Sequence, residues 1–245
     1  LYIGGAFPRS ESGRSREVQL AKGGVANIAG GSRKDLREAV RVARIAAEPW
    51  AARTAMVRGQ ILYRVAELME GRAAQFRDDL INHGASKSDA AAEVSAAIDR
   101  MVWYAGWPDK LSAVLGGTNP VASSHFVFTL PEPTGVIASI APEASPLLGL
   151  VSRLGGILAG GNVAIVLASE SAPLPAVTLA ETLAVSDVPA GVVNIITARR
   201  AELLPHLVRH ADIDGYDLWG CPDELLVEAE QGAAEHVARV ARRPH

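Results

Sequence analysis

Four short segments of this sequence lie where an α/β protein with a parallel sheet would bind a ligand. Each follows an apolar run typical of a buried strand, and they are residues 141–146, 168–173, 197–200 and 219–223. In parallel α/β sheets, ligands bind beyond the carboxyl ends of the strands, where helix N-termini direct backbone N–H groups at anions. None of the four segments has the glycine pattern of a phosphate-cradling loop, G-x-G-x-x-G or G-x-x-x-x-G-K-S/T. The sequence therefore indicates a ligand crevice without a standard phosphate loop.

Single side chains in these segments carry weak signals for catalysis. Glu143 would titrate abnormally if it stood alone in a cleft, but a solvated loop acid is the more common case. Cys221 lies at a predicted helix start, which lowers a thiol pKa, whereas the two acidic residues that follow oppose this effect. We therefore expect a buried structural cysteine. Arg199 and Arg200 are expected on the solvated surface, and no catalytic residue is assigned.

Glycine pairs and scattered histidines in the sequence have ordinary structural explanations. Gly155-Gly156 and Gly160-Gly161 fall inside or at the end of a predicted helix, where close packing and a helix C-cap account for them. The six histidines have no recognisable spacing to a paired acid or a nucleophile. We expect them at surface or packing positions, and no metal ligand is assigned.

The composition places the chain among globular proteins and excludes several classes of function. Its 245 residues are 49% hydrophobic and 21% charged, with a formal net charge of -3, so there is no basic excess to bind nucleic acid. One cysteine excludes an internal disulfide framework and favours a reducing compartment. The uncharged run between Arg153 and Glu170 falls short of the ~20 residues needed to cross a bilayer. We therefore expect a cytoplasmic protein with no nucleic acid or membrane partner.

The first part of the chain, residues 1–117, is predicted to be helical. Apolar residues repeat at helical spacing over 34–50, where Pro49 is expected to end or kink the helix. A second helix is expected over 56–69, and a third from about Ser88 to Leu115. We expect these three helices to precede any long strand.

The rest of the chain predicts an extended ribbon followed by alternating strands and helices. Residues 121–130 have strand character and end in prolines, which predicts a protruding ribbon rather than a central strand. From residue 135, strands that are apolar on both faces alternate with helices, and the last helix is expected to run from Pro222 into residues 242–245. The fold class is therefore α/β, with a Rossmann-like parallel sheet of about 4–5 strands covered by helices on both faces, after a helical segment and a β ribbon.

Short motifs run in a fixed order through the chain to about Gly220. They are Gly4-Gly5, Lys34-Asp35 before the helix that ends near Trp50, Arg58-Gly59-Gln60-Ile61, Tyr104-Ala105-Gly106-Trp107, Glu132-Pro133-Thr134-Gly135, Leu158-Ala159-Gly160-Gly161-Asn162, Ser169-Glu170 and Val188-Pro189-Ala190-Gly191. In type, order and spacing this set resembles the amino-terminal half of an aldehyde dehydrogenase. The resemblance implies a domain of the type that binds NAD in that family.

The positions that act in this family are altered here. Where the family has Pro-Trp-Asn, whose amide helps to stabilise an oxyanion, the chain has Pro142-Glu143-Ala144. Where it has Lys-Pro-Ser-Glu, which holds the adenosine ribose, the chain has Leu167-Ala168-Ser169-Glu170, and Ala198 replaces a glycine. Trp219-Gly220-Cys221 replaces Thr-Gly-Ser, and the indole is expected to fill cofactor space. The resemblance thus leaves Ser169, Glu170 and Gly220 as vestigial cofactor-binding positions that we expect to be unused.

The resemblance further implies a pseudoenzyme domain. The family's glutamate base in a Glu-Leu-Gly-Gly pattern and its nucleophilic cysteine do not occur in this sequence. We expect one aldehyde-dehydrogenase-like domain over 1–245, with a helical part (1–117), an oligomerisation-type ribbon (118–134) and a Rossmann-like part (135–245), and without the catalytic domain. It is most similar to the non-catalytic carboxyl-terminal unit of a tandem, family-sixteen aldehyde dehydrogenase. The opening at Leu1 fits such a piece of a longer polypeptide.

On this hypothesis the domain has a structural or assembly role and binds no cofactor, while NAD belongs to the catalytic unit of the parent. Its partners would be that catalytic unit in the same polypeptide and a second copy, because the ribbon matching residues 121–130 is the oligomerisation element of ordinary relatives. One alternative is a functional NAD-binding half that oxidises aldehydes to carboxylic acids with a partner catalytic domain. A second is a plain Rossmann module that binds a small molecule or a protein in the crevice. Saturable NAD binding would favour the first alternative, and another ligand at the strand ends the second.

Overall fold

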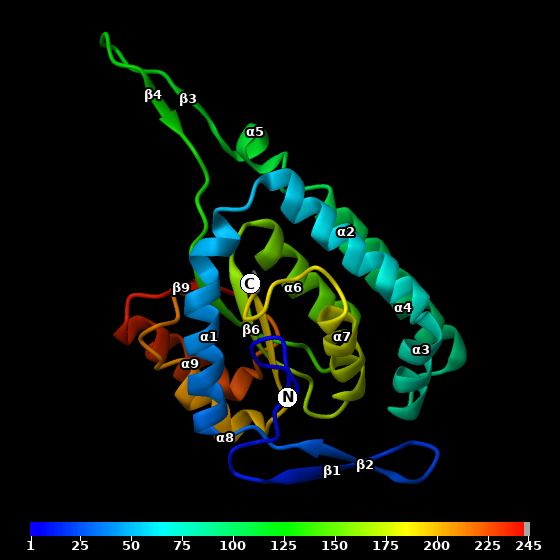
Figure 1. Cartoon of the computed structure of the whole chain (residues 1–245). Coiled ribbons are helices and arrows are strands. Elements are labelled where there is room, and N and C mark those ends of the chain that lie inside the picture. The colour runs from blue at the N-terminus through cyan, green and yellow to red at the C-terminus, as the bar shows by residue number, and fades with distance from the viewer. Residues whose placement is uncertain (243–245) are drawn as a thin grey trace.

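The carboxyl-terminal part of the chain forms a five-stranded parallel sheet (Figure 1). The computed structural model describes residues 1–242, and the strands lie in the order β7-β6-β5-β8-β9. Their bounds are β5 (Val136–Ile140), β6 (Val163–Leu167), β7 (Val193–Ile196), β8 (Gly215–Asp217) and β9 (Arg239–Ala241). The predicted α/β class and Rossmann-like sheet are confirmed.

Helices cover both faces of this sheet because its central strands are apolar on both sides. Every residue of β6 is buried, as a strand between two helix layers requires. Helices α6 and α7 cover one face, with α2, α3 and α4 packed outside them, while α1, α8 and α9 lie over the other face. The bounds are α1 (Arg33–Ala51), α2 (Ala55–Gly71), α3 (Ala73–Asn82), α4 (Lys87–Ala105), α5 (Leu111–Leu115), α6 (Leu148–Ala159), α7 (Leu174–Ala184), α8 (Arg200–Leu207) and α9 (Asp223–Glu235).

A capping box starts α1. The backbone N–H of Ser32 donates to the Asp35 carboxylate at 2.7 Å, and the Asp35 N–H donates to the Ser32 hydroxyl oxygen at 3.4 Å. Apolar residues then face the core at helical spacing as far as Trp50, which is 1% exposed. The helix ends at Ala51, two residues after Pro49 and close to the predicted end.

The predicted third helix, over 88–115, is wrong in its extent. The structure has α4, which ends at Ala105, and the separate short helix α5. Gly106 and Pro108 interrupt the helical path, because glycine weakens a helix and proline lacks the N–H that continues one. Helix α3 was not predicted, since Phe76 and Leu80 are its only buried residues and leave a weak pattern in the sequence.

An antiparallel hairpin precedes the helices, contrary to expectation. It consists of β1 (Ser15–Gln19) and β2 (Val25–Ala29). Gly23 and Gly24 form its turn with φ of +83° and +98°, which glycine adopts without strain. The strands were missed because Val18 and Ile28 are the only residues that they bury, so the alternating pattern is faint.

The ribbon protrudes from the domain as predicted (Figure 1). Its strands β3 (Gly117–Asn119) and β4 (Val127–Thr129) pair antiparallel, and all their residues are exposed. Strand structure was predicted over 121–130, but most of that range connects the two strands. The start of the ribbon pairs with its end because Gly117 lies opposite Thr129.

The last helix is shorter than predicted and does not reach residue 242. Helix α9 ends at Glu235, Val237 takes a left-handed φ of +57°, and the chain turns back to form β9 beside β8. Residues 243–245 lie outside the described residues. Within residues 1–242, no helix is both long and apolar enough to cross a membrane.

The glycine pairs have the structural roles that we predicted. Gly160 caps α6, and Gly161 follows with a φ of +79°. Gly155 allows α6 to approach α4, because a Cβ there would lie 2.3 Å from Cδ2 and 2.7 Å from Cγ of Tyr104. The close contact between α4 and α6 therefore requires a residue without a side chain at position 155.

We predict that Gly155→Ala lowers the free energy of unfolding by about 1–3 kcal/mol, because the added methyl group overpacks the contact with Tyr104. Urea denaturation measures this change. Gly71→Ala is the matched control, since Gly71 also lies in a helix and a methyl group there would meet no atom within 4 Å. We expect the control to be neutral or slightly stabilising. Equal losses in both variants would contradict the packing role of Gly155.

Candidate functional site

The order of the strands reverses at β5, which creates the site where such a sheet binds ligands. Strands β6 and β7 follow on one side of β5, and β8 and β9 on the other. The helices that follow β5 and β8 therefore lie on opposite faces, and ligands of such sheets bind beyond the carboxyl ends of these strands. The four segments predicted to line a crevice meet at this edge.

Glu143, in the segment after β5, has a carboxylate that bridges to the segment after β6. The backbone N–H groups of Glu170 and Ser171 donate to it at 2.9 and 3.0 Å. The hydroxyl groups of Ser169 and Ser171 donate to it at 2.6 and 2.5 Å. The side chain is 39% exposed, but both oxygens of its carboxylate are bound by the protein. The expectation of a solvated loop acid is therefore wrong for the charged group itself.

Arg200, the first residue of α8, has a guanidinium that lies among the same segments. Its side chain is 5% exposed, and Nη2 lies 2.7 Å from Oε1 of Glu143. Nη1 donates to the carbonyl oxygen of Gly220 at 3.2 Å, and Nη2 donates to that of Ala141. The backbone N–H of Arg200 donates to the Glu170 carboxylate at 2.9 Å. One arginine thus joins the segments that follow four strands, and we call this set of contacts, with Ser169 and Ser171, the crevice network.

The two charges of the crevice network compensate each other. Burial raises the pKa of Glu143, but hydrogen bonds from Ser169, Ser171 and two backbone N–H groups outweigh it and hold this pKa below its ordinary value of 4.5. Burial lowers the pKa of Arg200, and the charges of Glu143 and Glu170 oppose that shift. An arginine side chain stays protonated in proteins, so the cost of burying it must be met by partners. Glu143 is the carboxylate that forms an ion pair with it.

The position of Arg200 corrects the sequence-based expectation that both adjacent arginines are solvated. Arg199 is exposed, whereas Arg200 is 4% exposed and forms the centre of the network. Arg199 is the N-cap of α8 and Arg200 its first residue, so their side chains leave the helix in different directions. The available signal was the place of Arg200 directly after a predicted strand, at the mouth of the crevice.

The structure brings the three predicted cofactor positions together, but each contacts the protein itself. Ser169 is 2% exposed, donates to Glu143 and accepts a backbone N–H at 2.9 Å. Glu170 accepts the backbone N–H at the start of α8. Gly220 lies so near β5 that a Cβ there would stand 2.1 Å from the carbonyl oxygen of Ile140. Close packing of the strand ends therefore accounts for this glycine.

A second polar cluster lies beside the crevice network and includes Trp219. The indole is 37% exposed, and the guanidinium of Arg153 lies 4.9 Å from its ring centroid. Asp217 accepts the backbone N–H of Trp219 at 3.2 Å and lies 3.6 Å from Arg153. The cluster holds the indole against α6. Exclusion of a cofactor by this indole stays a prediction.

Cys221 is buried, as predicted for a structural thiol. It is 5% exposed, and burial raises its pKa to about 11, against the opposing effect of Arg200. A thiol with this pKa is almost wholly protonated at neutral pH and is a poor nucleophile. In the described part of the chain, no group of three or more His, Cys, Asp or Glu side chains could hold a metal ion.

We predict that Glu143→Gln destabilises the protein, because it removes the charge that compensates the Arg200 guanidinium. At pH 7 the free energy of unfolding should fall by about 1–3 kcal/mol, less than for a fully buried pair since Glu143 is partly exposed. The folded-state pKa of Glu143 lies below 4.5, so this stabilisation is present above pH 4.5 and is lost as the pH falls through the folded-state pKa. The difference between the wild type and the variant should therefore shrink in acid.

Urea unfolding at pH 7 and at several acidic pH values measures this difference. Glu48→Gln, an exposed change on α1, is the control for loss of one carboxylate and should alter stability little at any pH. A Glu143→Gln effect that is absent at pH 7, or that stays constant into acid, would contradict the role assigned to this carboxylate.

Comparison with known proteins identifies the family. The model of the aldehyde dehydrogenase family matches residues 14–235. The chain is 31% identical to aldehyde dehydrogenase family 2 member B4, mitochondrial, of Arabidopsis thaliana and 29% identical to aldehyde dehydrogenase 1A1 of Homo sapiens. The alignments cover 91% and 98% of this chain but 42% and 49% of those proteins. The chain thus spans about half the length of the curated relatives that it matches.

The fold agrees with this assignment. The structure of an aldehyde dehydrogenase from Bacillus cereus in complex with NAD+ matches with a TM-score of 0.92 at 27% sequence identity. The match covers 98% of this chain and 50% of that one. The family model spans most of the sequence, and the described structure follows the family fold over nearly its whole length. The chain therefore belongs to the aldehyde dehydrogenase family.

Proposed function

We propose that this chain is a non-catalytic domain of an aldehyde-dehydrogenase-like polypeptide, with a structural role and no bound NAD. The observation that carries the proposal is the crevice network. Arg200 and Glu143 meet beyond the ends of β5 and β8, in the space where a sheet of this topology receives its ligand. An internal ion pair in that space competes with any ligand for the same groups.

The backbone N–H groups at the strand ends support this proposal. Anions bind at helix starts and strand ends through free backbone N–H groups. Here the N–H groups of Glu170 and Ser171 donate to Glu143, and that of Arg200 donates to Glu170. Carboxylates of the chain thus take the place that phosphate oxygens would need, and their negative charge would repel a pyrophosphate.

The residues at the catalytic positions also support a loss of activity. Ala144 stands where the family has the asparagine that stabilises an oxyanion, and a methyl group donates no hydrogen bond. Cys221 is the single cysteine of the sequence, and it is buried with a raised pKa. The chain therefore contributes neither an oxyanion donor at that position nor a reactive thiol.

We further propose the parent and the partners of the domain. A catalytic unit in the same polypeptide would carry NAD and oxidise aldehydes, as in the tandem, family-sixteen arrangement. The ribbon would pair with a second copy, since its backbone edges are exposed and free strand edges pair with other chains. The domain would then serve the assembly of the longer protein.

We predict that calorimetric titration of the chain with NAD gives no saturable heat up to millimolar cofactor. A clear isotherm would contradict the proposal and favour a functional NAD-binding half. The double variant Glu143→Ala/Arg200→Ala is titrated in parallel, because it removes both charges and leaves neither unpaired. Binding by the double variant alone would show that the network closes the crevice. If neither protein binds NAD, we attribute the loss of binding to the missing family lysine, at whose position Leu167 stands.

We predict that the chain forms at least a dimer and that Phe126→Ser/Phe128→Ser converts it to a monomer. These side chains are 75% and 56% exposed on the ribbon, and their burial in an interface would be lost with the rings. Light scattering after size-exclusion chromatography measures the mass. Ile45→Ser is the control, since Ile45 is 64% exposed on α1, away from the ribbon. A monomeric wild type, or a double variant with unchanged mass, would contradict the role of the ribbon.

A further inference from the structure

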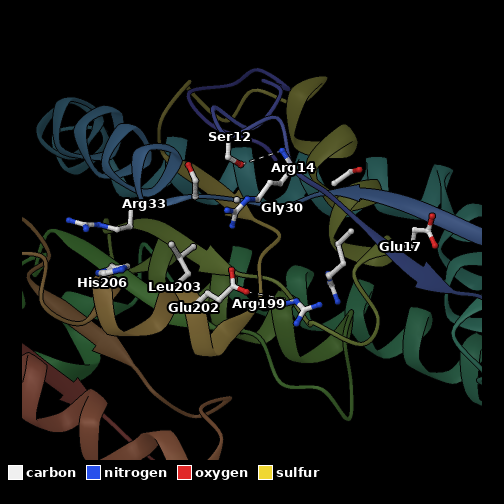
Figure 2. A pocket seen from close by; sticks show the side chains of 13 residues that line it. Ser12, Arg14, Glu17, Gly30, Arg33, Arg199, Glu202, Leu203 and His206 are labelled. Atoms are coloured by element: carbon white, nitrogen blue, oxygen red, sulfur yellow. Dashed lines mark hydrogen bonds and ion pairs between the residues drawn. The ribbon is translucent and has the colours of Figure 1, made fainter.

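A cavity of about 950 Å³ lies between the β1–β2 hairpin and α8, on the side of α8 that faces the hairpin (Figure 2). The hairpin and the start of α1 form one wall, and α8 forms the other. The α8 residues on its wall recur at positions 199, 202, 203 and 206, which is one stripe of the helix. Arg200 lies outside this stripe, so the cavity is separate from the crevice network.

Arginines from several elements surround this cavity. Arg14 directly precedes β1 and Arg16 lies within it, Arg33 is the first residue of α1, and Arg199 is the N-cap of α8. Two acidic residues, Glu17 and Glu202, also line it. Among these six residues the described structure has one ion pair, between Arg199 Nε and Glu202 Oε1 at 4.0 Å, and it is long and exposed. The lining therefore carries an excess of positive charge.

Arg16 gives an independent indication of a missing partner. It lies in the same row of β1 as the buried Val18, which places both side chains on the inner face of the hairpin. Its Nη2 atom is shielded from solvent and has no hydrogen-bond partner among residues 1–242. A buried charged donor without an acceptor costs about 1–3 kcal/mol or more. Arg16 itself lines the cavity, so a rotation of its side chain would bring this donor to a ligand that accepts hydrogen bonds.

The pKa of His206 agrees with an excess of positive charge at the cavity. The side chain of His206, on the α8 wall, has its pKa lowered first by burial and then by the positive charges of Arg33 and Arg209. Arg33 stands across the cavity from α8 (Figure 2). Positive charge on both walls raises the local concentration of an anion.

We propose that this cavity binds a small anion that carries at least two phosphate groups. Guanidinium groups match phosphate oxygens with paired hydrogen bonds, and here they come from both walls rather than from one element. One phosphate would be held near Arg16, and a second would reach Arg33 or Arg199. This site goes beyond the structural role proposed above and does not depend on whether NAD binds in the crevice.

Calorimetric titration of the chain with inorganic pyrophosphate, at constant ionic strength, tests the proposal. We expect saturable binding, tighter than for inorganic phosphate. Arg16→Gln should weaken pyrophosphate binding about tenfold or more, because it removes one charge-assisted hydrogen bond. Glu202→Gln should tighten binding, because it removes a repelling charge from the cavity, and this gain cannot arise from unfolding.

Arg37→Gln is the matched control, since Arg37 is exposed on α1 and does not line the cavity. It should change the affinity less than twofold. If Arg16→Gln does not fold, Arg199→Gln at the exposed end of α8 replaces it and should weaken binding severalfold. The proposal is overturned by the absence of saturable pyrophosphate binding, by an equal loss in Arg37→Gln, or by weaker binding in Glu202→Gln.

Discussion

The buried guanidinium of Arg200 is the constraint on which the ligand edge of this domain depends. A permanently charged group at 5% exposure must be paired, and the chain meets this demand with the Glu143 carboxylate and two backbone carbonyl oxygens. Those carbonyl oxygens belong to the segments after β5 and β8, so the same arginine holds the two sides of the topological switch point together. This arrangement requires glycine at position 220, because a side chain there would push the segments after β5 and β8 apart.

The crevice network joins the strand ends at the edge where a sheet of this order binds ligands. In a sheet of this order, the strand ends and helix starts leave backbone N–H groups free for an anion. Glu143 reaches these groups within the chain, and an internal carboxylate has an effective concentration that a dissolved ligand cannot match. An ion pair of the chain therefore joins the segments that follow these strands.

Much of the fold could be predicted from sequence, and the failures have physical causes. Strands β5 and β6 are continuous apolar runs, which only a parallel sheet between two helix layers buries. Strand β9 has three exposed residues and is held by backbone pairing with β8, so no side-chain pattern announces it. The β1–β2 hairpin was missed for the same reason. The four segments meet as topology predicts, because parallel strands end at one edge.

The contents of the crevice could not be predicted in the same way. Glu143 and Arg200 are far apart in the sequence, and each looks like an ordinary surface charge in its own segment. Their partnership depends on the direction in which the first residue of α8 leaves the helix, which only the packed structure fixes. From the altered family positions we expect unused cofactor positions, and the structure adds which side chains lie at the strand ends.

A double-mutant cycle between Glu143 and Arg200 tests this account most directly. The free energies of unfolding of Glu143→Ala, Arg200→Ala and the double variant yield the coupling energy of the pair. The account predicts a favourable coupling of at least about 1 kcal/mol at neutral pH. Additive effects, within about 0.3–0.5 kcal/mol, would show that the two side chains act independently and that no ion pair holds the crevice closed.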